Sequence, residues 1–487
     1  MSTESILAVF LIIPMLGAVV STPLRGRTGD VTPAVASALA LILVVVAVLQ
    51  VFPRTVVYHF GQLPWIHGAP TVFGFMLDPL SSLMLLVITT VGLLVVVYSG
   101  EYLSPRNRDH AVTHDKGDYY FWLLLFIGSM IGVVISPNLL QLFIFWEMTT
   151  ICSWALISYT REPEALRAGF KAVIMTHVGS VFLMVALVVL FVATGSFDFN
   201  ALDKLAPDTR TVVFALIMLA GWAKAAQFPF FTWLPDAMSA PTPISAYLHA
   251  AAMVKAGVYL VARVALSNTK LADEVGLVLA GMAMFTMLVA VTMYFFQDDL
   301  KRLLAFSTIA NLSYILLGVA LGVLGSTTGF EGGVLHIVNH AAGKGLLFLC
   351  VGAIAYATGT KSISELSGVG RRMPIVGISF LVGMFAIAGV PPLSCFWSKF
   401  YILTGAFELG NAAGTVLGVL IAIESLVAFA WFLYVAQKVF LGRISDKAQS
   451  VEDPPWPITV PLIVFVILCV VAPLVGWPII NAIEAGL

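Results

Sequence analysis

The sequence predicts an all-α, polytopic membrane protein with about fourteen transmembrane helices. Two observations predict this fold class. Of the 487 residues, 60% are hydrophobic and only 10% are charged, and the mean hydropathy is +0.99, which lies outside the range of soluble globular proteins. Apolar stretches of about 20 residues, enough to span a bilayer, also recur from Ile6 to Ile480, and no soluble domain fits between them.

The spans are placed on the apolar runs, and the connections on stretches rich in proline, glycine or charge. The first seven spans are expected at 5–22, 32–52, 78–98, 119–136, 138–160, 167–194 and 210–231. The next seven are expected at 242–266, 273–296, 302–324, 332–358, 374–404, 412–440 and 457–484. The first expected span, 5–22, has no basic segment before it and no small-residue cleavage site before Arg25. We therefore interpret it as a membrane span rather than a signal peptide.

Basic residues in the connections support this count, because Lys and Arg accumulate on the cytoplasmic side of a membrane. The odd-numbered connections hold fifteen: Arg25, Arg27, Arg106, Arg108, Lys116, Arg161, Arg167, Lys301, Arg302, Lys361, Arg371, Arg372, Lys438, Arg443 and Lys447. The even-numbered connections hold four: Arg54, Lys204, Arg210 and Lys270. We therefore expect a multi-pass protein of the cell (inner, cytoplasmic) membrane with both termini on the outer side.

Proline interrupts the seventh and the twelfth expected span. Pro229 and Pro235 follow Lys224, and the sequence Gly-Val-Pro-Pro-Leu at 389–393 precedes Lys399. A broken helix is tolerated at membrane depth where protein or water satisfies the freed backbone groups. The two breaks are five spans apart, and an odd number of crossings reverses orientation. This predicts two inverted five-helix repeats, at 119–266 and 273–440, between N-terminal helices at 1–118 and a last helix at 457–487.

Titratable side chains lie inside several expected spans, where each is costly unless it is paired or hydrated and so indicates a function. The candidates are Glu147, Lys224, His249, Lys255, His336, His340, Lys344 and Lys399. Three of them, at 336, 340 and 344, stack on one face of the eleventh helix at about 6 Å per step. Because histidine and buried lysine can both exchange a proton in the physiological range, the pattern predicts a proton relay.

Structural roles are weighed beside this relay. A single intramembrane histidine can be a hydrogen-bonding residue between helices, and Glu147 with Lys224 can be a static ion pair. Asp78 is interpreted as a helix cap, Lys171 and Arg263 as residues that reach the headgroups, and Glu424 is left open between a structural and a functional role.

Several function classes are excluded by what the sequence lacks. The four cysteines, Cys152, Cys350, Cys395 and Cys469, are far apart in apolar surroundings and are interpreted as buried structural thiols. No haem-ligand pair, cysteine cluster or Gly-x-Gly-x-x-Gly motif is found, so we expect no cofactor, no metal site and no redox site in this chain. The net charge of −1 predicts no nucleic-acid partner.

Longer motifs give a family resemblance over nearly the whole chain. These motifs are Phe-Trp-Glu ending at Glu147, the segment from Lys224 to Pro235, Ala-Pro-Thr-Pro at 240–243 leading to His249 and Lys255, Asp-Leu-Lys-Arg-Leu-Leu-Ala-Phe-Ser-Thr at 299–308, and Asn339 to Lys344. They resemble the antiporter-like subunits of respiratory complex I, membrane-bound hydrogenases and Mrp-type cation/proton antiporters. Within this family, the eighth span is most similar to the A-type Mrp subunit and to the L-type subunit of complex I.

The resemblance implies roles for the candidate residues. Glu147 and Lys224 match the glutamate–lysine pair of a first half-channel, Lys255 with His249 matches the link between halves, and Lys399 matches the terminal lysine of the second half-channel. The residues His336, His340 and Lys344 match the connecting relay. The M-type complex I subunit is less similar, because it carries glutamate where Lys399 stands, and a lateral helix or extra C-terminal domain is not expected after residue 487.

The implied function is proton translocation by one subunit of a multisubunit membrane complex, with other membrane subunits and lipid as neighbours. The preferred parent is a Mrp-type antiporter that exchanges protons and Na⁺. The alternative is a complex I-like NADH:quinone oxidoreductase or a membrane-bound hydrogenase. A redox enzyme in its own right and an inert scaffold are the two other hypotheses. The missing cofactor motifs speak against the redox enzyme, and the inert scaffold does not explain the four buried lysines.

Overall fold

The computed structural model describes residues 2–60, 72–110, 116–267 and 271–484. Lys270 of the expected connections lies outside these ranges. The first half contains α1 (Thr3–Ser21), α2 (Gly26–Val51), β1 (Val56–Phe60), β2 (Phe73–Leu77), α3 (Pro79–Tyr102), α4 (Gly117–Ile135), α5 (Leu139–Ile157), α6 (Pro163–Thr194), α7 (Pro207–Lys224), α8 (Trp233–Asp236), α9 (Thr242–Ala250) and α10 (Met253–Leu266). The second half contains α11 (Asp273–Met293), α12 (Leu300–Val323), α13 (Thr327–Thr358), α14 (Pro374–Ala388), α15 (Ser394–Glu408), α16 (Ala412–Phe440) and α17 (Trp456–Glu484).

The expectation of a polytopic helical membrane protein is confirmed. Within the described residues, twelve helices are long and apolar enough to cross a membrane, with α9 and α10 counted together. The seventh and the twelfth expected span are not among these twelve helices. In the seventh, α7 ends at Lys224 and non-helical chain follows, and the twelfth is divided into α14 and α15. The fourteen expected spans therefore all have helical counterparts.

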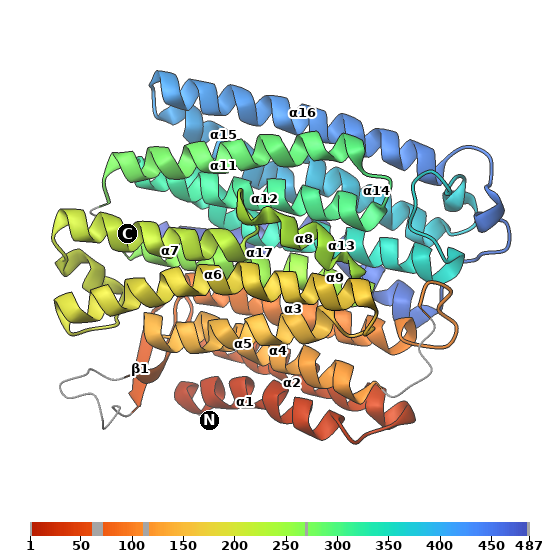
Figure 1. Ribbon diagram of the computed structural model, residues 1–487, viewed down its shortest axis with the longest axis horizontal. Coiled ribbons are helices and arrows are strands. Elements are labelled where there is room, and N and C mark those ends of the chain that lie inside the picture. The colour runs from red at the N-terminus through yellow and green to blue at the C-terminus, as the bar shows by residue number, and fades with distance from the viewer. Residues whose placement is uncertain (1, 61–71, 111–115, 268–270, 485–487) are drawn as a thin grey trace.

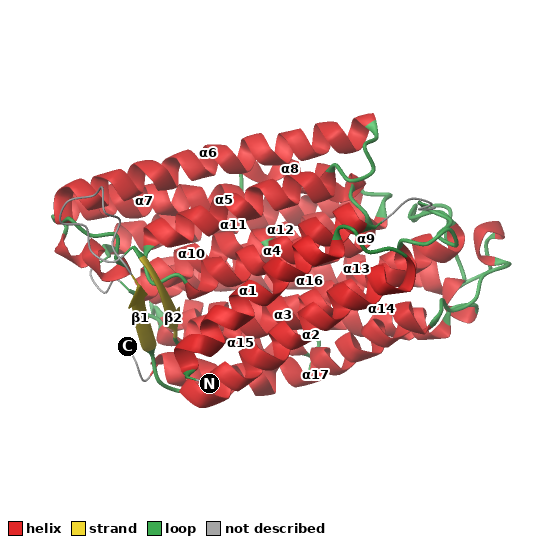
Figure 2. Ribbon diagram, turned by 90° about the horizontal axis from the view of Figure 1, so that it is seen from below, coloured by secondary structure: helices red, strands yellow, loops and turns green. Residues whose placement is uncertain are grey.

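The helices form one bundle in which α13 takes a central place. Figure 1 shows α16 at one edge of the bundle and α1 and α2 at the opposite edge. Helix α13 packs against α3, α9, α12, α14, α15 and α17, and nearly all of its residues from Val334 to Ala355 are buried. Both chain ends lie toward the side of the bundle that carries β1, in Figure 1 and in Figure 2.

The break in the seventh span is stabilised by its neighbours. After Lys224 the chain leaves the helix, and Ala226 takes a left-handed conformation with φ of 51°. The freed backbone groups are bonded, because Gln227 N donates to Trp222 O (3.0 Å) and the Trp222 indole donates to Phe228 O (2.7 Å). The Gln227 side chain accepts a 2.7 Å hydrogen bond from Ser313 of α12. Such internal bonding is what makes a broken helix tolerable inside a membrane protein.

Two local features differ from the sequence analysis. The expected span 242–266 is divided at Ala251 and Ala252, whose N–H groups both donate to Tyr247 O at 3.0 Å. No proline or glycine stands at this point, so the composition carries no signal for the break. The second feature is the antiparallel hairpin β1–β2, in which Val56 is paired with Leu77, and its strands are too short to register in a search for membrane-length runs.

Candidate functional site

The eight predicted residues lie on six helices of the same bundle. Lys224, His249, Lys255, His336, His340 and Lys344 are fully buried, and Lys399 is 7% exposed. Glu147 is the more exposed member, with 25% of its side-chain surface accessible. Charged or titratable groups with so little exposure are rare in protein interiors unless they are paired or functional.

The first group contains Lys224, at the last residue of α7, and Glu147 on α5. The Lys224 ammonium donates to Trp146 O (2.6 Å) and Thr150 Oγ1 (3.2 Å), and it lies 4.0 Å from the centroid of the Trp146 ring. No ion pair within 4.0 Å joins Lys224 to Glu147 in the described structure, although the two interact electrostatically at longer range. The static ion pair considered from the sequence is therefore not formed.

The Glu147 carboxylate instead contacts His177, a residue that the sequence analysis did not name. The distance from His177 Nδ1 to Glu147 Oε2 is 3.1 Å. His177 lies within α6, and 60% of its side-chain surface is exposed on the outside of the bundle. His177 lies within the expected span 167–194. A titratable side chain inside a span indicates a function, so the sequence could have identified His177 as it did the other histidines.

The second group lies on either side of the break between α9 and α10. His249 precedes this break and Lys255 follows it. Both nitrogens of His249 and the Lys255 ammonium have no hydrogen-bond partner among the described residues. The His249 ring lies 4.5 Å from the Phe348 ring of α13, centroid to centroid, so this group adjoins the central helix.

The third group is the row on α13. The His336 and His340 rings are 6.0 Å apart, centroid to centroid, in agreement with the spacing expected from the helix. The two His336 nitrogens lie 2.8 Å from Ser398 Oγ and 3.1 Å from Asn311 Oδ1. Both nitrogens of His340 are buried without a partner in the described structure.

The α13 row, formed by His336, His340 and Lys344, lies close to the second group. His340 lies within electrostatic range of Lys255, Lys344, His336 and His249. The Lys344 ammonium donates to Leu304 O at 3.2 Å. The structure therefore brings together the predicted residues of the eighth and eleventh expected spans.

The fourth group surrounds Lys399 on α15, directly after the break at 389–393. Gly389 ends α14 with φ of 85°, and a methyl group added to it would lie 3.1 Å from Lys399 Cδ. The Lys399 ammonium lies 4.5 Å from the Tyr314 ring centroid, and this ring is 5.5 Å from His336. Tyr314 therefore connects Lys399 to the α13 row.

Two charged residues that we expected near the headgroups have protein partners. Arg263 is 3% exposed and forms an ion pair with Asp78, with Nη2 2.8 Å from Oδ1, so its predicted exposure is wrong. Asp78 also caps α3 by accepting the Ser81 N–H at 2.7 Å, as predicted. Lys171 forms a 2.7 Å ion pair with Asp236, which follows the break in the seventh span.

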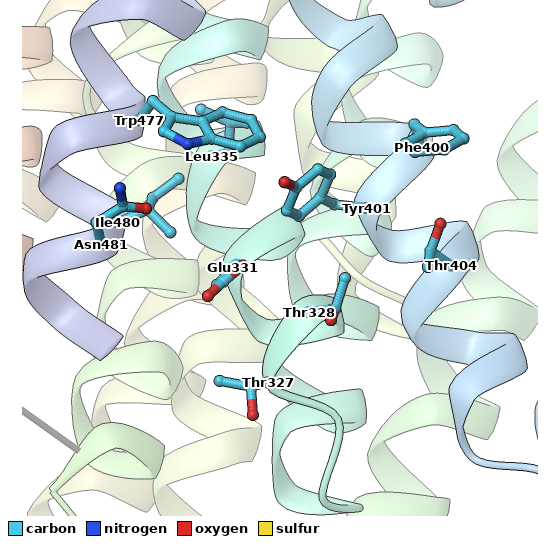
Figure 3. Close-up of a pocket in the computed structure, with 10 residues that line it drawn as sticks. All are labelled: Thr327, Thr328, Glu331, Leu335, Phe400, Tyr401, Thr404, Trp477, Ile480 and Asn481. Atoms are coloured by element: carbon cyan, nitrogen blue, oxygen red, sulfur yellow. The ribbon is translucent and has the colours of Figure 1, made fainter. Parts of the chain in front are cut away.

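A cavity of about 540 Å³ opens beside the first turns of α13 (Figure 3). Glu331, Tyr401 and Asn481 reach it from α13, α15 and α17. A second cavity of about 400 Å³, lined in part by Glu408, shares Thr327 and Thr328 with the first. Both cavities adjoin the connection between α12 and α13, which is even-numbered and is expected on the outer side of the membrane.

No group of three or more potential metal ligands is found in the described part of the chain. The four cysteines are free and buried, which confirms the interpretation that they are thiols in the protein interior. The assembled site thus consists of amines, imidazoles, a carboxylate and aromatic rings. Such groups can bind and pass on protons, and they can change the net charge of the membrane interior as they do so.

Family models and known proteins match long parts of this chain. Residues 136–424 match the family model described as NADH:quinone oxidoreductase/Mrp antiporter, TM, and residues 65–111 match the N-terminal model of complex I chain 5. The chain is 33% identical to NAD(P)H-quinone oxidoreductase subunit 5 of Chaetosphaeridium globosum, over 83% of this chain and 62% of that protein. It is 36% identical to the A-type subunit of the Na⁺/H⁺ antiporter of Alkalihalophilus pseudofirmus, over 81% of this chain and 51% of that protein.

Two solved structures share the fold. A chain of the Mrp complex from Dietzia sp. DQ12-45-1b superposes with a TM-score of 0.87 at 30% identity, over 98% of this chain and 51% of that chain. A chain of the membrane-bound sulfane sulfur reductase, an archaeal respiratory membrane complex, superposes with a TM-score of 0.85 at 26% identity, over 99% of this chain and 96% of that chain. The chain spans about half to two-thirds of the length of the two curated relatives above. The family match, which covers more than half of the chain, shows that the chain belongs to the NADH:quinone oxidoreductase/Mrp antiporter transmembrane family.

Proposed function

We propose that this chain is a proton-translocating subunit of a multisubunit membrane complex, and that the complex is a Mrp-type antiporter that exchanges protons and Na⁺. The observation that carries the proposal is the set of buried titratable groups on α7, α9, α10, α13 and α15, which includes Lys224, the α13 row and Lys399. A bilayer interior excludes such groups unless their charge has a use there. The similarity to one subunit of a Na⁺/H⁺ antiporter supports Na⁺ as the exchanged ion.

The first half of the path works by moving a charge next to Lys224. The ammonium form has two hydrogen bonds and one aromatic face as neighbours, and the Glu147 carboxylate is bound to His177. When the carboxylate approaches, Coulombic attraction stabilises the ammonium form, and when it moves back to His177, the proton is released more readily. Exchange of Glu147 between two partners thus loads and unloads Lys224.

The released proton then passes to the central row. His249, Lys255 and His340 are buried with polar nitrogens that have no partner among the described residues. Buried groups of this kind are usually hydrogen-bonded to ordered water. A short water chain between these side chains would carry the proton along α13 to His336 and then to Lys399.

The two halves of this path correspond to the predicted inverted repeats at 119–266 and 273–440. Each repeat contains one proline-broken span and one lysine beside the break. We place the odd connections, which are rich in Lys and Arg, in the cytoplasm. The cavity beside Glu331 and Tyr401 then faces the outer side, where we propose that the second half releases its proton.

A redox-driven complex of the complex I or hydrogenase type is the second candidate. It is supported by the similarity to subunit 5 of an NAD(P)H-quinone oxidoreductase and by the fold shared with a chain of a respiratory membrane complex. In that case the same relay moves protons without Na⁺. The partners that co-purify with the chain separate the two candidates, since small multi-span subunits indicate the antiporter and iron–sulfur or nickel subunits indicate the redox complex.

The function is tested in vesicles that contain the intact complex. We expect Na⁺ addition to collapse an imposed pH gradient, and we expect Lys224→Ala or Lys399→Ala to abolish this collapse without loss of assembly. Lys447→Ala, which changes an exposed lysine, is the matched control and should leave transport unchanged. A gradient that is insensitive to Na⁺ argues against the antiporter, and full transport by either relay variant argues against the relay.

A further inference from the structure

Glu424 is a buried carboxylate to which the sequence analysis assigned no role. It lies near the middle of α16 and is 1% exposed, whereas its neighbours Ile423 and Leu426 are 50% and 68% exposed. Helix α16 therefore presents apolar side chains outward and one acid inward. Burial of an ionised carboxylate is costly unless hydrogen bonds and a positive charge compensate it.

The hydrogen-bond partner of Glu424 is Tyr314 of α12. The Tyr314 hydroxyl donates to Glu424 Oε2. Ser425 Oγ lies 2.7 Å from the same hydroxyl, and because the tyrosine proton is used on the carboxylate, the serine hydroxyl is the donor to the tyrosine oxygen. Glu424 is thus joined to α12 by an oriented hydrogen-bond chain.

A positive charge lies over the ring of Tyr314. The Tyr314 hydroxyl donates to Glu424, and the Lys399 ammonium lies 4.5 Å from the centroid of the same tyrosine ring. A hydroxyl hydrogen bond to a carboxylate raises the electron density of the ring, and this strengthens its attraction for a cation. Opposite charges that share one neighbour attract each other more strongly in an interior of low dielectric constant than in water.

We propose that Glu424 is the counter-charge of Lys399 and acts on it through Tyr314, as Glu147 acts on Lys224 in the first half. Glu424 is then a positioning residue, because it holds Lys399 in its ammonium form without contacting it. This inference rests on the proposed function, since it assigns the control of the terminal lysine in the same relay.

Other titratable groups surround this arrangement and were considered as alternatives. They are Lys255 on α10, Tyr294 after α11, His336 and Lys344 on α13, Cys395 on α15 and Cys469 on α17. Helix α14, which also packs against α16, contains no titratable residue. Glu424 is the acidic side chain in this set, so it is the one that can neutralise a protonated Lys399.

The test is the pH profile of proton transport in vesicles that contain the intact complex. Glu424→Gln keeps the size of the side chain and removes its charge. Loss of the counter-charge destabilises the ammonium form of Lys399, so the alkaline half-maximum of transport should move to lower pH by about one unit, a tenfold change in the proton-dissociation constant. Glu365→Gln is the control, because Glu365 is an exposed acid in the connection between α13 and α14.

Tyr314→Phe provides a second variant that keeps the ring and removes the hydroxyl. It should shift the profile in the same direction, and the double variant should shift it no further than Glu424→Gln alone. A wild-type profile for Tyr314→Phe or for an assembled Glu424→Gln complex overturns the inference. Lys399→Ala separates the two proposals: if it is inactive while these profiles stay wild-type, the relay stands without this role for Glu424, and if it is active, the proposed function fails.

Discussion

Gly257→Ala tests how closely α7 and α10 must pack for Lys224 to hold its position. Gly257 lies two residues after Lys255, and a Cβ added to it would be 2.4 Å from Gly221 O and 2.7 Å from Ala225 N. Both are backbone atoms next to the break, so neither can rotate away. Carbon atoms pack best at about 3.5–4.0 Å, which means that the two helices must separate by about 1 Å.

Overpacking of this kind costs about 1–3 kcal/mol. A shift of Ala225 also displaces the adjacent Lys224, whose ammonium bonds to Trp146 O at 2.6 Å, so we expect transport to fall by about tenfold or more. The assays are the thermal unfolding of the purified complex and proton transport in vesicles.

Gly281→Ala is the control for this prediction. Gly281 lies inside α11, and an added Cβ would meet nothing within 4 Å. Alanine is favoured over glycine in a helix by about 0.5–1 kcal/mol, so this variant should unfold at the wild-type temperature or slightly above it. A Gly257→Ala complex with the same unfolding temperature and rate as Gly281→Ala would refute the reasoning.

Three further substitutions have defined outcomes. His177→Ala removes the hydrogen-bond partner of Glu147, so the Glu147 carboxylate should stay with Lys224 and transport should slow severalfold. The measurement is the initial rate of vesicle acidification, and an unchanged rate contradicts the exchange of partners. Gly389→Ala places a side chain at φ of 85°, which costs about 1–2 kcal/mol, and pushes on Lys399; transport should fall while α-helical circular dichroism is retained, and wild-type transport would show that the contact has no effect. Asp78→Asn leaves Arg263 as a buried charge without its counter-charge, so the complex should lose about 3–5 kcal/mol of stability, and an unfolding temperature within about 1 °C of wild type would contradict this role, since a loss of that size lowers it by several degrees.

The spans could be predicted from the sequence because a bilayer imposes length and apolarity on each helix independently of its neighbours. The breaks after Lys224 and before Lys399 were predictable from the prolines near these lysines, since proline removes a backbone donor. Proline alone does not decide such a break, because Pro14 and Pro473 lie inside continuous helices. The break at Ala251 and Ala252 was not. It is formed by two backbone N–H groups that share Tyr247 O, and its sequence of alanines is typical of a continuous helix.

The residue types of the site were predictable, but several of their partners were not. An intramembrane lysine or histidine is conspicuous in the sequence, whereas the contact that it makes depends on the rotation and depth of each helix. Arg263 and Asp78, which are separated by 185 positions, form an ion pair that no local pattern indicates. Glu147 contacts His177 rather than Lys224. Glu424 on α16 accepts a hydrogen bond from Tyr314 on α12, and this contact is what suggests a role for it.

The central claim is that protons cross this chain through the buried groups on α13. Lys344→Met tests it most directly, because methionine has a similar volume and no proton to exchange, and because the lysine it replaces donates to one backbone carbonyl, Leu304 O. Vesicles that contain this variant complex should show no coupled proton transport, while gel filtration and thermal unfolding show an intact assembly. Transport at the wild-type rate by an intact Lys344→Met complex would contradict the claim.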